Sequence, residues 1–274
     1  VMVGSFVCSG LINLYQAAGV ILGANIGTTI TGQLIAFNLS DVAPLFVITG
    51  VVMFMFSKKQ NTKKIGGVIL GFGILFMGLS TMGDAMSSLR ESPHIVALLK
   101  SLSNPFAAIL VGFAITAILQ SSSATVGIVI LLASQGFLQF TICFYLILGC
   151  NMGSCVSALL ASLGGKKDAK RAAWIHFLFN IIGSVAIFIV LLFALQPIAD
   201  AIMKVSGGNM GRAVANAHTL IKICEVILLF PFMKWVVRVT YLIIPGKDAS
   251  PDDEYELKYI GNSTMITPTT AVIS

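Results

Sequence analysis

The sequence holds 274 residues, of which 57% are hydrophobic and only 10% charged, and its formal net charge is +6. Soluble domains carry about 25% charged residues, so this composition excludes an ordinary soluble protein and predicts an all-α, polytopic membrane protein. The positive charge does not indicate a nucleic-acid partner, because the lysines gather in short loops between apolar runs, as in the cytoplasmic loops of membrane proteins.

Apolar runs follow one another along the chain, and a helix that crosses a bilayer needs about 20 residues. The runs at 65–87, 172–195 and 212–244 are long enough to cross. The run at 43–56 is short and needs its flanks to cross, and 105–135 is too long for one span and is interrupted by polar residues.

Basic residues predict the orientation of the chain in the membrane. The loops at 58–64 and 166–171 each carry four lysine or arginine residues, and Lys234 and Arg238 lie near the end of the last apolar run. Such loops stay in the cytoplasm, so we expect all three on that side. The segment 246–274 is polar and acidic, and is typical of a cytoplasmic linker.

An internal repeat divides the chain. Residues 21–37, ILGANIGTTITGQLIAF, match residues 147–163, ILGCNMGSCVSALLASL, at an offset of 126. If 43–56 crosses the membrane, the two copies run in opposite directions, as in the inverted repeats of many secondary transporters. We therefore divide the chain into 1–62, the end of a first repeat, and 63–245, a second repeat with closing helices.

The stretch QSSSAT, residues 120–125, is unusual because no charged residue or histidine lies between Lys100 and Lys166. In lipid, irregular backbone is tolerated only where it is buried in protein or lines a cavity. QSSSAT and the runs GANIGTT (23–29) and GCNMGSC (149–155) therefore predict helix breaks. The free carbonyls of a break suit Na⁺, and its free N–H groups suit an anion.

A neutral site of this kind favours binding of an anion together with a cation, because an unpaired charge is costly in a low dielectric. Serine and threonine in membrane helices also bond to local carbonyls or allow close packing. Four consecutive polar residues, together with a repeated Gly-Asn motif, favour a binding site over that structural role. At the repeat offset, the first copy of QSSSAT would fall just before Val1, so we expect this chain to lack it.

Three ionisable residues, His218, Lys222 and Glu225, share one helix face by their spacing. Lys222 and Glu225 should pair, because a pair makes both tolerable in a membrane. The group is either a gating element or a structural ion pair near a helix end. His176 and Asn180 are likewise four residues apart and should form an interhelical hydrogen bond. The five cysteines show no metal-binding spacing.

These motifs, together with NAHTL at 216–220, resemble the type II sodium/phosphate cotransporters and their bacterial relatives. The resemblance implies symport of inorganic phosphate with Na⁺ by alternating access at the cell membrane, with re-entrant hairpins around the substrate and no organic cofactor. It assigns phosphate to Gln120, Ser121, Ser122, Ser123 and Thr125. It assigns Na⁺, the only metal ion expected, to Asn25, Thr28, Thr29, Gln120, Ser123, Asn151 and Ser154.

Further partners and other functions follow from the same residues. The linker 246–274 resembles the approach to a PhoU-like regulatory domain, and a homodimer is a further candidate assembly. A phosphate-sensing membrane scaffold is one alternative function. An intramembrane serine hydrolase, with Ser121–Ser123 as nucleophiles, is another, but it needs a histidine or lysine base and none lies between 101 and 165.

Overall fold

The computed structural model describes residues 2–37, 39–89 and 104–246, so the predicted linker after residue 246 lies outside the described residues. The described residues form helices and turns without a β-strand, and four helical stretches are long and apolar enough to cross a membrane. Large apolar side chains also point outward, for example Phe193, which is 86% exposed, and Ile118, which is 80% exposed. These features confirm the all-α membrane class.

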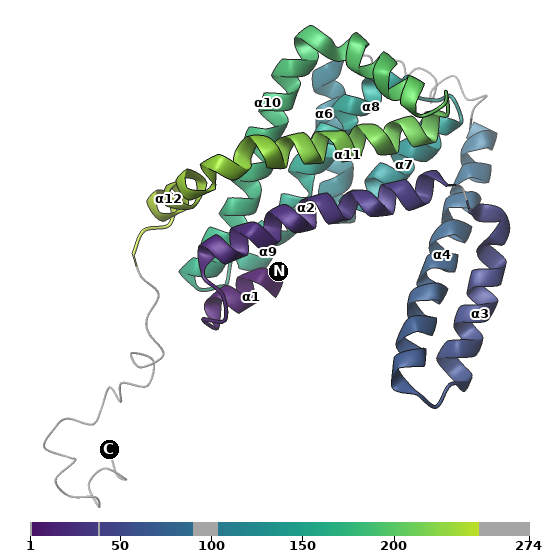
Figure 1. Cartoon of the computed structure of the whole chain (residues 1–274), viewed down its shortest axis with the longest axis horizontal. Helices are drawn as coiled ribbons and strands as arrows, with labels where there is room; N and C mark the ends of the chain where they lie inside the picture. Colours follow the sequence, from purple (N-terminus) through teal and green to yellow (C-terminus); the bar gives the residue numbers. More distant parts are fainter. Residues whose placement is uncertain (1, 38, 90–103, 247–274) are drawn as a thin grey trace, which may run out of the picture.

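The helices, shown in Figure 1, follow one another as α1 (Met2–Cys8), α2 (Leu14–Ala36), η1 (Ser40–Val42), α3 (Ala43–Phe56), α4 (Gln60–Leu89), α6 (Pro105–Leu119), α7 (Ser122–Ser134), α8 (Phe140–Gly153), α9 (Cys155–Ser162), α10 (Lys167–Val205), α11 (Met210–Leu229), η2 (Phe230–Phe232) and α12 (Met233–Ile243). The four long stretches are α2, most of α4, α8 with α9, and α10.

The sequence repeat has a structural counterpart with the same offset. Helix α2 begins at Leu14 and α8 begins at Phe140, while α2 ends at Ala36 and α9 ends at Ser162. Both pairs of limits are 126 residues apart. The helix that precedes each copy obeys the same rule, because α1 and α7 end at equivalent positions.

The turn after α1 and the turn after α7 are also the same. Each contains a glycine with a positive φ, 72° at Gly10 and 77° at Gly136. The residue after each glycine donates its N–H to the carbonyl five positions earlier, at 3.0 Å for Leu11 and 2.9 Å for Phe137. This Schellman geometry needs a residue that accepts the left-handed conformation, which explains why glycine stands at both positions.

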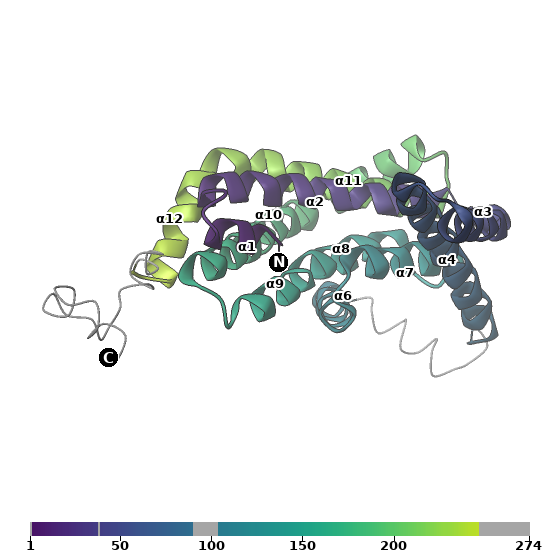
Figure 2. The same cartoon turned by 90° about the horizontal axis from the view of Figure 1, so that it is seen from below.

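The two copies run in opposite directions. In Figure 1, α2 runs from left to right, whereas α8 and then α9 run from right to left, and the rotated view of Figure 2 agrees. Helix α11 packs against both α2 and α8 and so lies between the copies. Opposite directions of the two copies are what an inverted repeat requires. Helices α3 and α4 form a hairpin that lies across the direction of α2, so α3 does not run alongside the first copy.

Arg171 joins the start of α10 to the chain that follows α12. Arg171, at the start of α10, is buried and donates a hydrogen bond of 2.7 Å to the carbonyl of Ile244, just after α12, and another to the carbonyl of Gly246. The 166–171 loop and the end of α12 therefore share one side of the molecule. The 58–64 loop lies away from them, at the tip of the α3–α4 hairpin.

The predicted break at QSSSAT is present. Gln120 ends α6 in the left-handed conformation, with φ 54° and ψ 26°, and Ser121 is extended before α7 begins. The N–H of Gln120 still donates to the carbonyl of Thr116, at 2.7 Å. Helix α6 thus keeps its last backbone hydrogen bond, and a new helix begins after one extended residue.

The predicted break at GANIGTT, residues 23–29, is wrong. Helix α2 is continuous there, because the polar side chains bond to carbonyls of their own helix and leave its backbone ladder intact. Asn25 donates to the carbonyl of Ile21 at 2.9 Å, and Thr28 donates to that of Asn25 at 2.8 Å. In the second copy, α8 passes to α9 at Ser154, whose backbone keeps helical angles, so that boundary is slight.

The closing helices differ from the predicted spans in two places. Helix α10 continues beyond 195 to Val205, and it kinks at Ala194, where φ is −130°. Pro197 explains the kink, because proline lacks an N–H group and its ring collides with the carbonyl four residues earlier. The predicted run 212–244 is likewise divided at η2, which contains a proline.

Close packing of α6 on α8 forms the centre of the second repeat. At Gly149 of α8, an added Cβ would lie 2.1 Å from the carbonyl oxygen of Ile109 and 2.8 Å from the backbone nitrogen of Phe113. Gly112 of α6 faces the carbonyl of Leu146 in the same way, with a distance of 2.3 Å. Small residues let membrane helices approach to backbone contact, and these glycines do so here.

We predict that Gly149→Ala destabilises the protein by about 1–3 kcal/mol, because the new methyl group overlaps the α6 backbone and forces the helices apart. Thermal unfolding in detergent measures the change. Gly71→Ala on α4 is the matched control, since nothing lies within 4 Å of its Cβ position and alanine is the better helix former. Equal melting temperatures for Gly149→Ala and the parent would contradict the packing argument.

Candidate functional site

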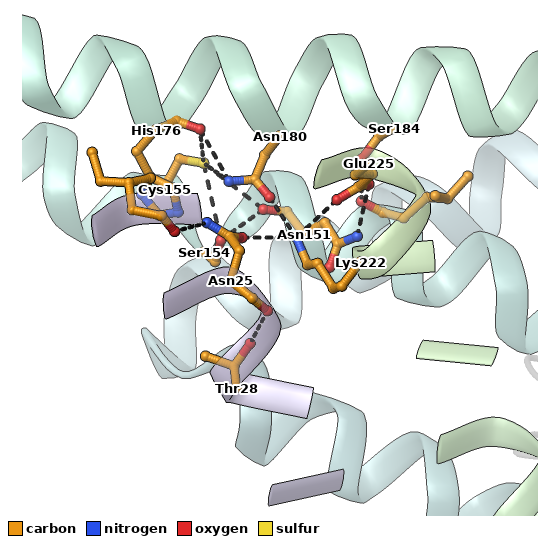
Figure 3. A network of polar contacts seen from close by, with 12 residues as sticks. Asn25, Thr28, Asn151, Ser154, Cys155, His176, Asn180, Ser184, Lys222 and Glu225 are labelled. Carbon is orange, nitrogen blue, oxygen red and sulfur yellow. Dashed lines mark hydrogen bonds and ion pairs between the residues drawn. The ribbon is translucent and has the colours of Figure 1, made fainter. Parts of the chain in front are cut away.

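A buried polar network joins α2, α8, α10 and α11 in the middle of the bundle (Figure 3). Its side chains lie deep inside the protein, and none of them is more than 6% exposed. The members are Asn25, Asn151, Asn180, Ser184, Lys222 and Glu225.

Lys222 and Glu225 form the ion pair at its centre, with Nζ and Oε2 3.1 Å apart. The residues are three positions apart on α11, so they lie on one face of that helix. The same ammonium donates to Oδ1 of Asn25 on α2, at 2.9 Å, and to Oδ1 of Asn180 on α10, at 2.6 Å. All three ammonium hydrogens therefore have oxygen partners.

The second carboxylate oxygen of Glu225 faces the second repeat copy and α10. Oε1 accepts a hydrogen bond of 3.1 Å from Nδ2 of Asn151 on α8, and Oγ of Ser184 lies 3.5 Å away. Gly183 makes room for the carboxylate, because a Cβ there would lie 2.8 Å from Cγ of Glu225.

Asn25 and Asn151 are equivalent positions of the two repeat copies, 126 residues apart. Lys222 binds the first and Glu225 binds the second. One ion pair on α11 thus bridges the two copies through the same residue of each.

The predicted pairing of Lys222 and Glu225 is confirmed, whereas His218 stands apart from the pair. His218 is buried and packs against Gly32 of α2, and its Nδ1 has no hydrogen-bond partner in the described part of the chain. The predicted interhelical role of Asn180 is confirmed by its bond to Lys222.

Asn180 and Ser184 were not among the predicted site residues. A signal for Asn180 exists in the sequence, because His176 and Asn180 have the same four-residue spacing as His218 and Lys222. The ends of these two pairs, Asn180 and Lys222, are the residues that meet. No comparable signal marks Ser184.

The QSSSAT break forms a second cluster of polar side chains. Ser121 caps α7, since its Oγ accepts from the N–H of Ala124 at 3.3 Å, and the buried Thr125 donates to the carbonyl of Ser121 at 3.1 Å. Ser122 and Ser123 are half-buried in the first turn of α7, and within residues 104–246 and the other described ranges their hydroxyls have no hydrogen bond. The N–H groups of such a first turn attract anions.

Gln120 is exposed at this break, and neither it nor Ser123 is hydrogen-bonded to the network in the part of the chain that the structure describes. The remaining predicted sodium ligands lie on α2 and α8. Thr28 donates to the carbonyl of Asn25 at 2.8 Å, and its repeat equivalent Ser154 donates to that of Asn151 at 2.7 Å. Thr29, which is buried, donates to the carbonyl of Ile26.

Two cavities lie along α2, one beside Ile21 and Asn25 near its middle and one beside Ile35 and Ala36 at its C-terminal end. The first has a volume of about 660 Å³ and extends from Lys166 to Asn25, and the second has about 430 Å³ and lies beside the end of α7. Six residues that line the first have their repeat equivalents in the lining of the second: Gly4, Ser5, Cys8, Ser9, Ala161 and Ser162 match Ile130, Leu131, Ser134, Gln135, Ile35 and Ala36. The cavities are therefore related by the inverted repeat.

We predict that removing one partner of the central ion pair costs more stability than removing both. Lys222→Met or Glu225→Met leaves a buried, unpaired charge and should cost about 3–5 kcal/mol, whereas the double variant leaves none. Thermal unfolding in choline chloride compares the three variants without an alkali cation. A double variant that loses the sum of the single losses would show that the two charges do not depend on each other.

Comparisons with known proteins identify the family of the chain. The family model described as Na⁺/Pi-cotransporter matches residues 1–84 and 81–211. Each stretch contains one copy of the internal repeat. No solved structure matches the chain.

Similar proteins include YqeW of Bacillus subtilis, which is 28% identical over 90% of this chain and 79% of its own length. YjbB of Salmonella typhimurium, whose name provisionally assigns it inorganic phosphate export, is 27% identical over 99% of this chain and 49% of its own length. The sodium-dependent phosphate transport protein 2A of Rattus norvegicus is 28% identical over 52% of this chain and 23% of its own length.

The chain thus spans about half the length of the export proteins that it matches, at 49%. The family model, by contrast, covers most of the chain and both repeat copies. This protein belongs to the Na⁺/Pi-cotransporter family.

Proposed function

We propose that the protein carries inorganic phosphate across the membrane together with Na⁺, by alternating access. The observation that carries the proposal is the helix break at Gln120, which starts α7 at half-buried serines in a member of the Na⁺/Pi-cotransporter family. Backbone N–H groups at such a terminus offer an anion hydrogen bonds without placing a fixed positive charge beside it.

The residues of the break divide into two roles in this proposal. Ser121 and Thr125 shape the turn, because their hydroxyls are used in bonds within it. Ser122 and Ser123 bind phosphate, since their hydroxyls have no hydrogen bond in the described part of the chain and can donate to phosphate oxygens. Gln120, which is exposed, adds an amide that can bind either ion.

Sodium would take hydroxyl and carbonyl oxygens from α2 and α8. Thr28 and Ser154 each spend their hydroxyl hydrogen on a carbonyl of their own helix. Each hydroxyl oxygen therefore has only lone pairs to offer, which suits a cation. Thr29 has the same arrangement, and Asn25 and Asn151 lie one turn earlier on the same helices.

The repeat-related cavities support alternating access. One lies near the middle of α2 and the other at its C-terminal end, and the larger one reaches Asn25 from the side of Lys166. In an inverted-repeat transporter, rocking of one repeat against the other opens one cavity while the other closes. If the basic residues face the cytoplasm, as the sequence predicts, the larger cavity opens toward the cytoplasm.

The direction of net transport depends on the gradients of both ions, so export and uptake are compatible with one mechanism. The cell-membrane location, the cytoplasmic C-terminus, the homodimer and the PhoU-like domain stay predictions. For a hydrolase, a base would have to contact a serine of the break, and in the described residues no histidine or lysine is hydrogen-bonded to Ser121, Ser122 or Ser123.

Transport by the complete protein in proteoliposomes tests the proposal. We expect phosphate to accumulate with an inward Na⁺ gradient and not when choline or a proton gradient replaces it. Sodium-linked phosphate binding without transport would favour the sensing scaffold instead.

We predict that Ser122→Ala in the complete protein lowers phosphate transport at least tenfold while expression and melting temperature stay unchanged, because a charge-assisted hydrogen bond contributes about 1.5–3 kcal/mol. Thr81→Ala is the control, since Thr81 is an exposed residue on α4 whose hydroxyl donates to the carbonyl of Met77 in its own helix. Transport by Ser122→Ala at the rate of the control would remove Ser122 from the phosphate site.

A further inference from the structure

We propose that Asn25, Asn180 and Glu225 form a site for a monovalent cation, and that the ammonium of Lys222 occupies it as a tethered ion. The binding part of this inference stands on the network itself, and only its meaning for ion coupling rests on the proposed function. In the proposed transporter, this is a cation site that a lysine of the protein itself fills.

The geometry around Nζ of Lys222 is that of an ion among oxygens. Oδ1 of Asn180 lies at 2.6 Å, Oδ1 of Asn25 at 2.9 Å and Oε2 of Glu225 at 3.1 Å. These amide and carboxylate oxygens come from three different helices, α2, α10 and α11. Hard cations take carboxylate and amide oxygens of this kind as ligands.

A spare oxygen lies beside the site. Asn151 is 1% exposed and donates its Nδ2 to Glu225, while its own Oδ1 has no hydrogen-bond partner in the described part of the chain. A buried amide oxygen without a partner costs free energy. A cation that binds Glu225 with more than three oxygen ligands has a use for such an oxygen.

The charge of the site demands a cation. Glu225 is fully buried, and a buried carboxylate without a positive partner is strongly destabilising. Lys222 is its ion-pair partner. Removing the ammonium therefore leaves a negatively charged position lined by oxygens.

The tethered ion has a consequence for transport. An ammonium on α11 neutralises the site but cannot leave with the substrate, so this position adds no transported ion in the parent protein. The ammonium contacts Asn25 and its carboxylate partner contacts Asn151, so the tethered ion and Glu225 together link the two repeat copies.

Lys222→Met tests the inference, because methionine keeps the aliphatic length of lysine and vacates only the ammonium position. We expect the complete Lys222→Met protein to bind more radioactive sodium per chain in detergent than the parent does. Its melting temperature should rise steeply with sodium concentration, at constant ionic strength in choline chloride, as linkage requires of an ion that binds only the folded state.

Two further variants make the test decisive. Lys222→Met/Glu225→Met has neither charge, so it should fold in choline chloride and gain no sodium binding. Lys222→Arg keeps a tethered cation, and it too should gain none. If Lys222→Met proves unstable in choline chloride, recovery of monodisperse protein in sodium chloride is the equivalent supporting result.

A structural ion pair without ion-binding capacity predicts a different outcome. Lys222→Met would then be equally unstable in sodium and choline chloride, or would fail to fold in both, and would bind no additional sodium. Either result overturns the inference. Phosphate transport by the parent protein is measured separately, so failure of the proposed function would leave the binding result unchanged.

Discussion

The buried ion pair of Lys222 and Glu225 is the interaction on which the rest of the arrangement depends. Both charges lie where hydrocarbon surrounds the bundle, so each must find its partners inside the protein. The partners come from α2, α8 and α10, and they hold opposite ends of the pair. Fixing α11 therefore fixes the relative position of the two repeat copies.

Much of the fold could be predicted because the sequence repeats its local signals. Gly10 and Gly136 end equivalent turns, and QSSSAT interrupts an otherwise apolar run, so the offset and the break at Gln120 follow from residues alone. The false break at 23–29 has a physical cause. The side chains of asparagine and threonine can bond to carbonyls of an intact helix, or they can take the place of its backbone hydrogen bonds and interrupt it. The motif alone does not distinguish these two outcomes.

Only the contacts within one helix of the candidate site could be predicted from the sequence. The pairing of Lys222 with Glu225 follows from their spacing on one helix, but the partners on other helices depend on how the helices pack. Ser184 reaches Glu225 because Gly183 lets α10 approach closely, and no periodicity of the sequence encodes that contact. The sequence also could not show that the serines of the break are separate from the network.

Because the serines of the break and the buried polar network are separate, a coupled mechanism has to explain how one affects the other. Among the described residues, the break at Gln120 has no hydrogen bond to the network, so the proposed coupling of phosphate to a cation relies on helix packing. Helix α7 packs on both α2 and α11. At Gly32 of α2, an added Cβ would lie within 4 Å of Val126 on α7 and of His218 on α11. His218 is one helical turn before Lys222, so in the proposed function a shift of α7 on phosphate binding would act on α11 next to this lysine.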